Sequence, residues 1–148
     1  MSSQRVNKYP TFRYWLNDES TERLPIPATI PAFTAGSVVE TQTTSLTDVV
    51  LDSMVISPTP GDYVVFFDGT VSNTKDDHQG SISIYYDGVL LPITVRNVGG
   101  PKKEQYIGTR AMISGVTAGQ TIDVRWNVSN DAGVGTFHER HLVALKIR

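Results

Sequence analysis

The sequence contains no cysteine among its 148 residues, which excludes disulfide bonds, thiolate metal sites and cysteine nucleophiles. A chain of this length forms one domain that buries about 68–70% of its unfolded surface, so it needs no cross-links to be stable. We therefore expect a single domain held together by ordinary hydrophobic packing. A small secreted scaffold stapled by disulfides is excluded.

A strong charge of either sign is also missing, since the formal net charge is −2 and the isoelectric point is near 5.9. The chain therefore has no overall basic field to hold nucleic acid or an anionic membrane. The longest apolar runs, at residues 64–67 and 89–93, are far shorter than a membrane span. The first residues lack the apolar segment of a signal peptide. We expect a soluble protein without an export signal, a nucleic-acid partner or a membrane partner.

No long segment has helical periodicity, and no internal repeat indicates a propeller or a solenoid. Beyond residue 37, short apolar runs end at Gly, Pro, Asn and Asp, which is the pattern of strands joined by turns. Asp87-Gly88 is the strongest hairpin signal among these turns. About eight strands are predicted, at residues 38–43, 49–57, 63–72, 81–86, 89–96, 105–113, 121–129 and 136–147. Their spacing predicts an all-β fold, an antiparallel β-sandwich of the jelly-roll type.

Residues 1–35 have a different composition, which is rich in proline and aromatic residues. The stretch Leu24-Pro25-Ile26-Pro27 alternates apolar residues with proline, which favours extended backbone. So many aromatic side chains are unusual in a purely solvated tail. We predict an extended N-terminal arm over residues 1–35 that binds a partner, followed by a sandwich domain over residues 36–148. The residues expected to make the contact are Tyr9, Phe12, Tyr14, Trp15, Leu24 and Ile26.

Three predicted strands are apolar on both faces, at residues 63–67, 89–93 and 142–145. Successive side chains of a strand point to opposite faces, so these strands need cover on both sides. In a two-layer sandwich the second cover is the arm or another subunit. The sequence therefore predicts a subunit interface that includes Val64, Phe66, Leu90 and Leu142.

Few residues of the sequence indicate a catalytic site or a metal site. His138-Glu139-Arg140-His141 lacks one residue of the His-Glu-x-x-His zinc motif, and positions 138 and 141 of a strand point to opposite faces. The acidic loop Asp76-Asp77-His78 matches no EF-hand, and such loops are commonly just solvated. No nucleophile elbow, phosphate loop or dinucleotide fingerprint is present. A triad of Ser or Thr, His and an acid is not visible in a sequence. We expect no enzyme activity, no metal and no cofactor.

The strand and turn patterns at residues 40–45, 55–72, 82–89, 114–122 and 140–147 carry a family resemblance. In these segments the chain resembles the C1q/TNF-like jelly rolls of tailed-bacteriophage virion proteins. Such domains are typically homotrimers that serve as capsid decoration (cement) proteins, head fibres, tail-needle knobs or receptor-binding tips. The family carries no catalytic residues. The resemblance therefore implies a homotrimeric virion protein, assembled in the host cytoplasm, with the major capsid protein as its partner.

Two functions remain open under this resemblance. Residues 1–35 contain neither heptads nor repeats, which favours a cement protein that bridges major capsid subunits and stabilises the head over a fibre. Aromatic residues in a proline-rich segment also suit an extended docking peptide better than a rigid sugar platform. The alternative is a receptor-binding or carbohydrate-binding adhesin that uses the loops at residues 73–80 and 97–103.

Overall fold

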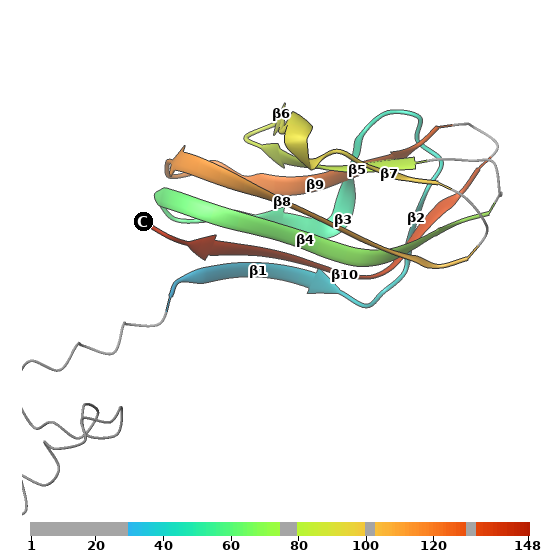
Figure 1. Ribbon diagram of the computed structural model, residues 1–148, viewed down its shortest axis with the longest axis horizontal. Helices are drawn as coiled ribbons and strands as arrows, with labels where there is room; N and C mark the ends of the chain where they lie inside the picture. The colour runs from blue at the N-terminus through green and yellow to red at the C-terminus, as the bar shows by residue number, and fades with distance from the viewer. Residues whose placement is uncertain (1–29, 75–79, 100–102, 130–132) are drawn as a thin grey trace, which may run out of the picture.

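The computed structural model describes residues 30–74, 80–99, 103–129 and 133–148. Within these residues two antiparallel sheets face each other (Figure 1), so the predicted β-sandwich is confirmed. Sheet A contains β1 (Ala32–Ser37), β2 (Thr41–Thr43), β4 (Gly61–Asn73), β8 (Gln105–Val116) and β10 (Gly135–Lys146). Sheet B contains β3 (Val49–Ile56), β5 (Gly80–Tyr86), β6 (Val89–Leu90), β7 (Arg96–Val98) and β9 (Ile122–Val128).

The strand order identifies the sandwich as a jelly roll. Sheet A has the order β1-β10-β4-β8, with β2 also paired to β10, and sheet B has the order β3-β9-β5-β6, with β7 also paired to β5. From β3 onward the chain passes repeatedly from one sheet to the other, and the last long strand, β10, lies beside β1 and β4. Consecutive strands therefore pack face to face across the core more often than they pair.

Alternation along each strand builds the core. In β9 the residues Ile122, Val124, Trp126 and Val128 are buried, and the side chains between them belong to the other face. The ring of Phe137 lies edge-on to Trp126, with centroids 5.0 Å apart, and connects the two sheets. Each large side chain buried in this way stabilises the fold by about 1.5–3 kcal/mol.

The hairpin predicted at Asp87-Gly88 is confirmed between β5 and β6. Both residues have positive φ, 49° and 78°, as the two central residues of a type I′ turn require. After this turn the expected strand at residues 89–96 is interrupted. Pro92 begins a short 3-10 helix, η1 (Pro92–Thr94), which separates β6 from β7 because proline cannot donate to a strand ladder.

The first strand lies where the arm was expected to continue. β1 begins at Ala32, and the carbonyl of Pro31 already accepts a hydrogen bond from the Lys146 N–H at 3.0 Å. The expected boundary between residues 35 and 36 therefore falls inside β1. Residues 1–29, with the six predicted contact residues of the arm, lie outside the described residues.

Candidate functional site: the outer face of sheet A

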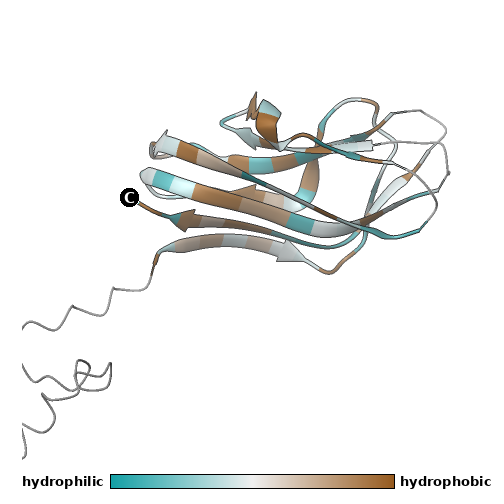
Figure 2. Cartoon of the chain, viewed as in Figure 1, coloured by the Kyte–Doolittle hydropathy of each residue, from teal (hydrophilic) through white to brown (hydrophobic). Residues whose placement is uncertain are grey.

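The strand register aligns the outward side chains of sheet A in rows across four strands. One row joins Ala32, Leu145, Val64 and Met112, and the next joins Thr34, Val143, Phe66 and Arg110. Figure 2 shows the continuous apolar stretch that β4 contributes. Met112 is 70% exposed and Phe66 is 39% exposed. The centre of this outer face is therefore apolar although nothing in the described part of the chain covers it.

The four predicted interface residues divide among three places. Val64 and Phe66 lie on the outer face of sheet A, as the alternation of β4 predicted. Leu90 lies in β6 of sheet B, paired with Tyr85. Leu142 is 0% exposed and belongs to the core, so its assignment to an outer surface is wrong. The outward apolar residues of β10 are its neighbours Val143 and Leu145.

An open hollow of about 330 Å³ lies on the same face, beside the apolar rows. Gly108 of β8 lies on its floor, opposite Asp68 of β4. Tyr106 and Arg110 stand on either side of Gly108, because residues two apart in a strand share a face. Arg96 reaches the hollow from β7, which belongs to the other sheet. The hollow is therefore built from three strands of both sheets.

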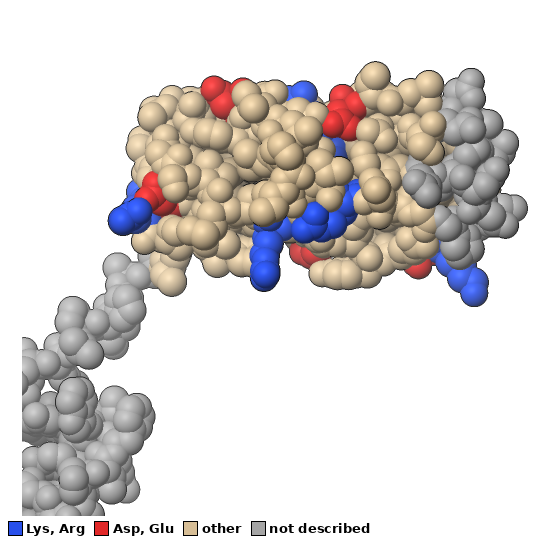
Figure 3. Space-filling model, turned by 45° about the horizontal axis from the view of Figure 1, so that its top comes forward, with Lys and Arg blue, Asp and Glu red and all other residues tan. Residues whose placement is uncertain are grey.

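Basic and aromatic groups dominate this hollow. Tyr106 is 75% exposed. The guanidinium of Arg96 donates hydrogen bonds to the carbonyls of Ile93 at 3.0 Å and Val95 at 2.8 Å. In the described part of the chain neither Arg96 nor Arg110 forms an ion pair. Figure 3 shows Lys and Arg side chains gathered midway along the body. Two guanidinium groups outnumber the one lining carboxylate, so the hollow attracts anions.

A β-bulge interrupts β10 where it crosses β4. His138 and Glu139 together lie opposite the single residue Thr70. Gly69 makes room for the bulge, because a Cβ there would lie 2.9 Å from the carbonyl oxygen of Glu139. The extra residue shifts the alternation and turns Arg140 into the core, where it is 0% exposed.

The same bulge places both histidines of β10 on the outer face of sheet A. His138 Nε2 lies 3.1 Å from Ser72 Oγ, and His141 Nδ1 lies 3.9 Å from Asp68 Oδ2. Ser72 and Asp68 share one face of β4. The prediction that positions 138 and 141 point to opposite faces is therefore wrong, because it assumed a regular strand. Among the described residues, no group of three or more His, Asp or Glu side chains is placed to hold a metal.

One cluster on this face has the arrangement of a hydrolase triad, with His138 between Ser72 and Glu40. His138 contacts Ser72 through Nε2, and its Nδ1 lies 2.8 Å from Glu40 Oε1. However, Glu104 Oε1 lies 3.7 Å from the Nε2 that would have to accept the serine proton. Ser72 is also part of the β4–β10 ladder, opposite Thr136, where backbone groups pair with each other instead of forming an oxyanion hole. We interpret the cluster as a structural contact.

Arg140 is a second structural contact, between the two sheets. Its guanidinium donates hydrogen bonds to the carbonyls of Asp52 at 3.0 Å, Val39 at 2.7 Å and His138 at 3.0 Å. It also pairs with the Asp52 carboxylate at 3.2 Å. Burial lowers the pKa of Arg140, and the Asp52 charge opposes this shift. Ser53, next to Asp52, has φ of 64°, within the irregularity of β3 that brings Asp52 to Arg140.

The outer face of sheet B carries a closed polar network. Tyr85 donates a hydrogen bond to Asp48, which also accepts one from Asn127 Nδ2 at 2.6 Å. Arg125 lies 4.1 Å above the Tyr85 ring and pairs with Asp123 at 2.7 Å. The hydrogen bond to Asp48, followed by burial, raises the pKa of Tyr85. Each of these side chains has a partner within the protein. The outer face of sheet B therefore has fewer available groups for binding a ligand than the outer face of sheet A has.

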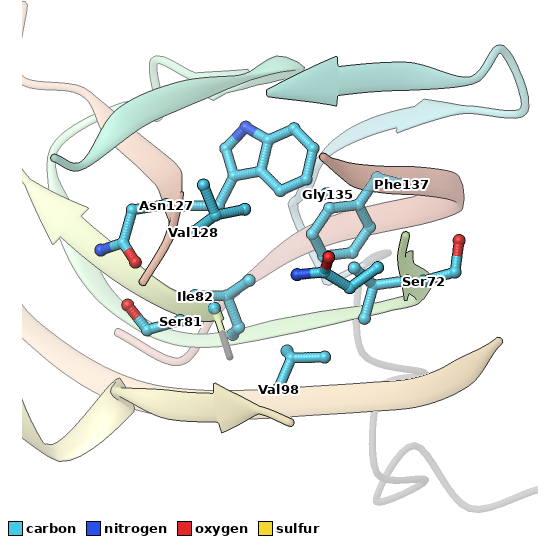
Figure 4. A pocket seen from close by; sticks show the side chains of 12 residues that line it. Ser72, Ser81, Ile82, Val98, Asn127, Val128, Gly135 and Phe137 are labelled. Carbon is cyan, nitrogen blue, oxygen red and sulfur yellow. The ribbon is translucent and has the colours of Figure 1, made fainter. Parts of the chain in front are cut away.

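A cavity between the sheets, shown in Figure 4, is too small for a ligand. Trp126, Phe137 and Val98 are among the side chains that line it. Its volume of about 10 Å³ is at the lower limit for one water molecule. It therefore holds at most one water molecule.

Several predicted features lie outside the described residues. They are the arm contacts, the acidic loop Asp76-Asp77-His78 and the tips of the loops proposed for an adhesin. In the described ranges the one helical element is η1, and no helix there has the length and hydropathy to cross a membrane.

No protein-family model matches the chain, and neither does any curated protein sequence. Several solved structures are similar to it. The CBM36-1 domain of a multidomain xylanase from the hindgut metagenome of Trinervitermes trinervoides is 9% identical, with a TM-score of 0.46, and the match covers 76% of this chain and 96% of that domain. Eiger TNF from S. frugiperda is 7% identical, with a TM-score of 0.47 and coverage of 80% and 94%. The VP2 protein of infectious bursal disease virus is 11% identical, with a TM-score of 0.49, and the match covers 80% of this chain but 36% of that one. These likenesses assign the chain to no family.

Proposed function

We propose that this protein is a structural component of a bacteriophage virion, a homotrimer that decorates the capsid and stabilises the head by bridging major capsid subunits. The observation that carries the proposal is the apolar centre of the outer face of sheet A, which nothing in the described part of the chain covers. Contiguous exposed apolar surface on a soluble domain marks an association site. The occupant that we propose for this face is a second copy of the chain.

The composition of the face fits a permanent interface. Its centre consists of Val64, Phe66, Val143, Leu145 and Met112, none of which is charged. Interface cores are depleted of charge and enriched in aromatic residues and methionine. The strands that carry these residues are long and paired in register, so the face is rigid before association and little entropy is lost on binding.

The capsid contact is assigned to the arm. Residues 1–29 lead into β1, at the edge of sheet A, and they combine four aromatic residues with three prolines. Aromatic side chains are favoured anchors in protein interfaces, and extended segments pair with sheet edges through their main chain. Many copies on one shell bind by avidity even when each contact is weak.

Sedimentation equilibrium of the full chain tests the subunit interface. We expect a trimer for the natural sequence and a monomer for Val64→Asp, because an unpaired charge at the centre of an apolar interface is not tolerated. Val89→Asp is the matched control, since Val89 is exposed on β6 of the other sheet and should leave the trimer intact. A monomeric natural protein, or a trimeric Val64→Asp variant, would rule out this interface.

Deletion of residues 1–29 tests the arm. We expect the truncated protein to remain trimeric but to lose binding to empty capsids in a co-sedimentation assay. If the truncated protein still saturates the capsids, the arm does not make the contact.

A receptor-binding or carbohydrate-binding role is the second candidate. The hollow at Gly108 favours it, because this hollow combines an exposed aromatic ring with basic groups that are not used in ion pairs in the described part of the chain.

A further inference from the structure

We propose that the hollow at Gly108 binds an acidic sugar, a pyranose ring that carries a carboxylate. The binding groups are Arg96, Arg110, Tyr106 and Asp68. This inference rests on the second candidate function, carbohydrate binding, and does not depend on the subunit interface proposed above. The site differs also from the loop tips that the sequence suggested for an adhesin, because it lies on the sheet itself.

The shape of the hollow depends on a glycine that the backbone does not require. Gly108 does not have a left-handed φ, and a Cβ at this position would lie 3.4 Å from the carbonyl of Phe67 and 3.8 Å from the Tyr106 ring, both ordinary contacts. The fold would therefore accept a side chain at position 108. Its absence leaves an open floor between Tyr106 and Arg110, where a ligand can approach the backbone.

The two arginines fit a carboxylate. Arg96 is held in place by the carbonyls of Ile93 and Val95, so little side-chain entropy is lost when it binds. Arg110 reaches the hollow from β8. Guanidinium groups bind carboxylates through paired, charge-assisted hydrogen bonds, which are stronger than hydrogen bonds between neutral groups.

The remaining groups fit the ring of a sugar. The exposed face of Tyr106 can pack against the apolar face of a pyranose. The Asp68 carboxylate accepts hydrogen bonds from ring hydroxyls. An acidic peptide would gain from the arginines but has no pyranose face for Tyr106 and no ring hydroxyls for Asp68. The volume of about 330 Å³ is at the lower end of the range for small-ligand sites, which suits one or two sugar rings.

Titration calorimetry with the full chain tests the proposal. The probes are trigalacturonic acid and N-acetylneuraminic acid, each compared with its neutral methyl ester, and an oligoaspartate of similar charge. We expect at least one free acid to bind about tenfold or more tightly than its ester, the effect of about one charge-assisted contact. Binding of neither acid, or equal binding of acid and ester, overturns the proposal. Oligoaspartate binding as tight as that of the sugar also overturns it, in favour of an acidic peptide.

Three variants locate the site. Arg110→Gln and Gly108→Leu should each weaken binding about tenfold or more, the first by removing a charge and the second by filling the floor. Arg148→Gln is the matched control, because Arg148 pairs with Asp62 at the far end of β4, away from the hollow. The Arg148→Gln variant should bind the probe as the natural protein does. Undiminished binding by Gly108→Leu overturns the proposal. Val64→Asp should bind the probe normally even where it fails to trimerise, so the two proposals fail separately.

Discussion

Individual charged side chains connect parts of this protein that are far apart in the sequence. Arg140 joins β10 to β3 and to the connection that follows β1. Asp62, at the start of β4, accepts hydrogen bonds from the Gly115 N–H at 2.7 Å and from Arg148 Nε at 2.9 Å. It therefore ties the end of β8 and the C-terminus to β4. Both contacts can be tested by single substitutions.

Arg140→Met should destabilise the protein by about 1–3 kcal/mol, because it removes the hydrogen-bond donor of a side chain that is 0% exposed, whereas the Asp52 carboxylate left behind is 65% exposed. Three carbonyl oxygens lose a donor in this variant, and each buried one adds to the loss. Urea unfolding measures the change. Arg148→Met is the control, expected to cost less than about 1 kcal/mol because its side chain is 84% exposed. Equal effects of the two substitutions would contradict this account of Arg140.

Because of Asp62, the stability of the protein should depend on pH in the acid range. The Gly115 N–H, and then Arg148, lower the pKa of Asp62 below its usual range. A carboxyl with a pKa lower in the folded than in the unfolded state adds stability at a pH above about 3.9, and this contribution is lost as the pH falls through the folded value. Asp62→Asn should therefore lower the urea midpoint more at neutral pH than at an acid pH where the Asp62 carboxyl is protonated in both the folded and the unfolded protein. An equal loss at both pH values would show that ionisation of Asp62 is irrelevant.

Among the secondary-structure elements, most strands could be predicted from the sequence, but the irregularities within them could not. The alternation in residues 121–129 and the Asp87-Gly88 turn are local signals, and both are found in the structure. β1 was missed because its sequence, Ala-Phe-Thr-Ala-Gly-Ser, has one large apolar residue. The bulge in β10 was missed because it depends on Gly69, which lies on another strand.

Substitution of Gly69 tests the bulge. Gly69→Val should destabilise the fold by about 1–3 kcal/mol, because its Cβ would press on backbone that cannot move aside easily. Gly108→Val, on the neighbouring strand, is the matched control, since its Cβ meets nothing closer than 3.4 Å. Thermal unfolding compares the two variants. If Gly108→Val were the less stable one, the bulge would not be the reason for glycine at position 69.

At the scale of the whole molecule, the two outer faces of the sandwich have different characters. The outer face of sheet B carries the Asp48–Tyr85–Arg125 network, whose members satisfy each other. The outer face of sheet A has an apolar centre that no described residue covers, and it also carries the hollow at Gly108. Association and ligand binding are therefore both expected on sheet A.

Two truncations test where the folded domain begins. Removal of residues 1–29 should leave the free energy of unfolding nearly unchanged, because β1 and its contact through Pro31 are retained. Removal of residues 1–37 should destabilise the protein strongly, because it exposes the edge of β10 and removes Phe33, whose ring lies 6.0 Å from that of Tyr63. Equal stability of the two truncated proteins, measured by urea unfolding, would place the boundary beyond β1.

Alternation and turn residues act over a few neighbouring positions, so the sequence is enough to predict an all-β sandwich without cysteine chemistry. It also indicated that β4 has two apolar faces. Which residues of β10 face outward depends on packing between strands. The bulge reverses the inward and outward alternation, so that Leu142 is buried and Val143 faces out. The tertiary structure also brings Arg96 of one sheet beside Gly108 of the other. These features depend on strand order and packing, which bring distant residues together and which no local pattern encodes.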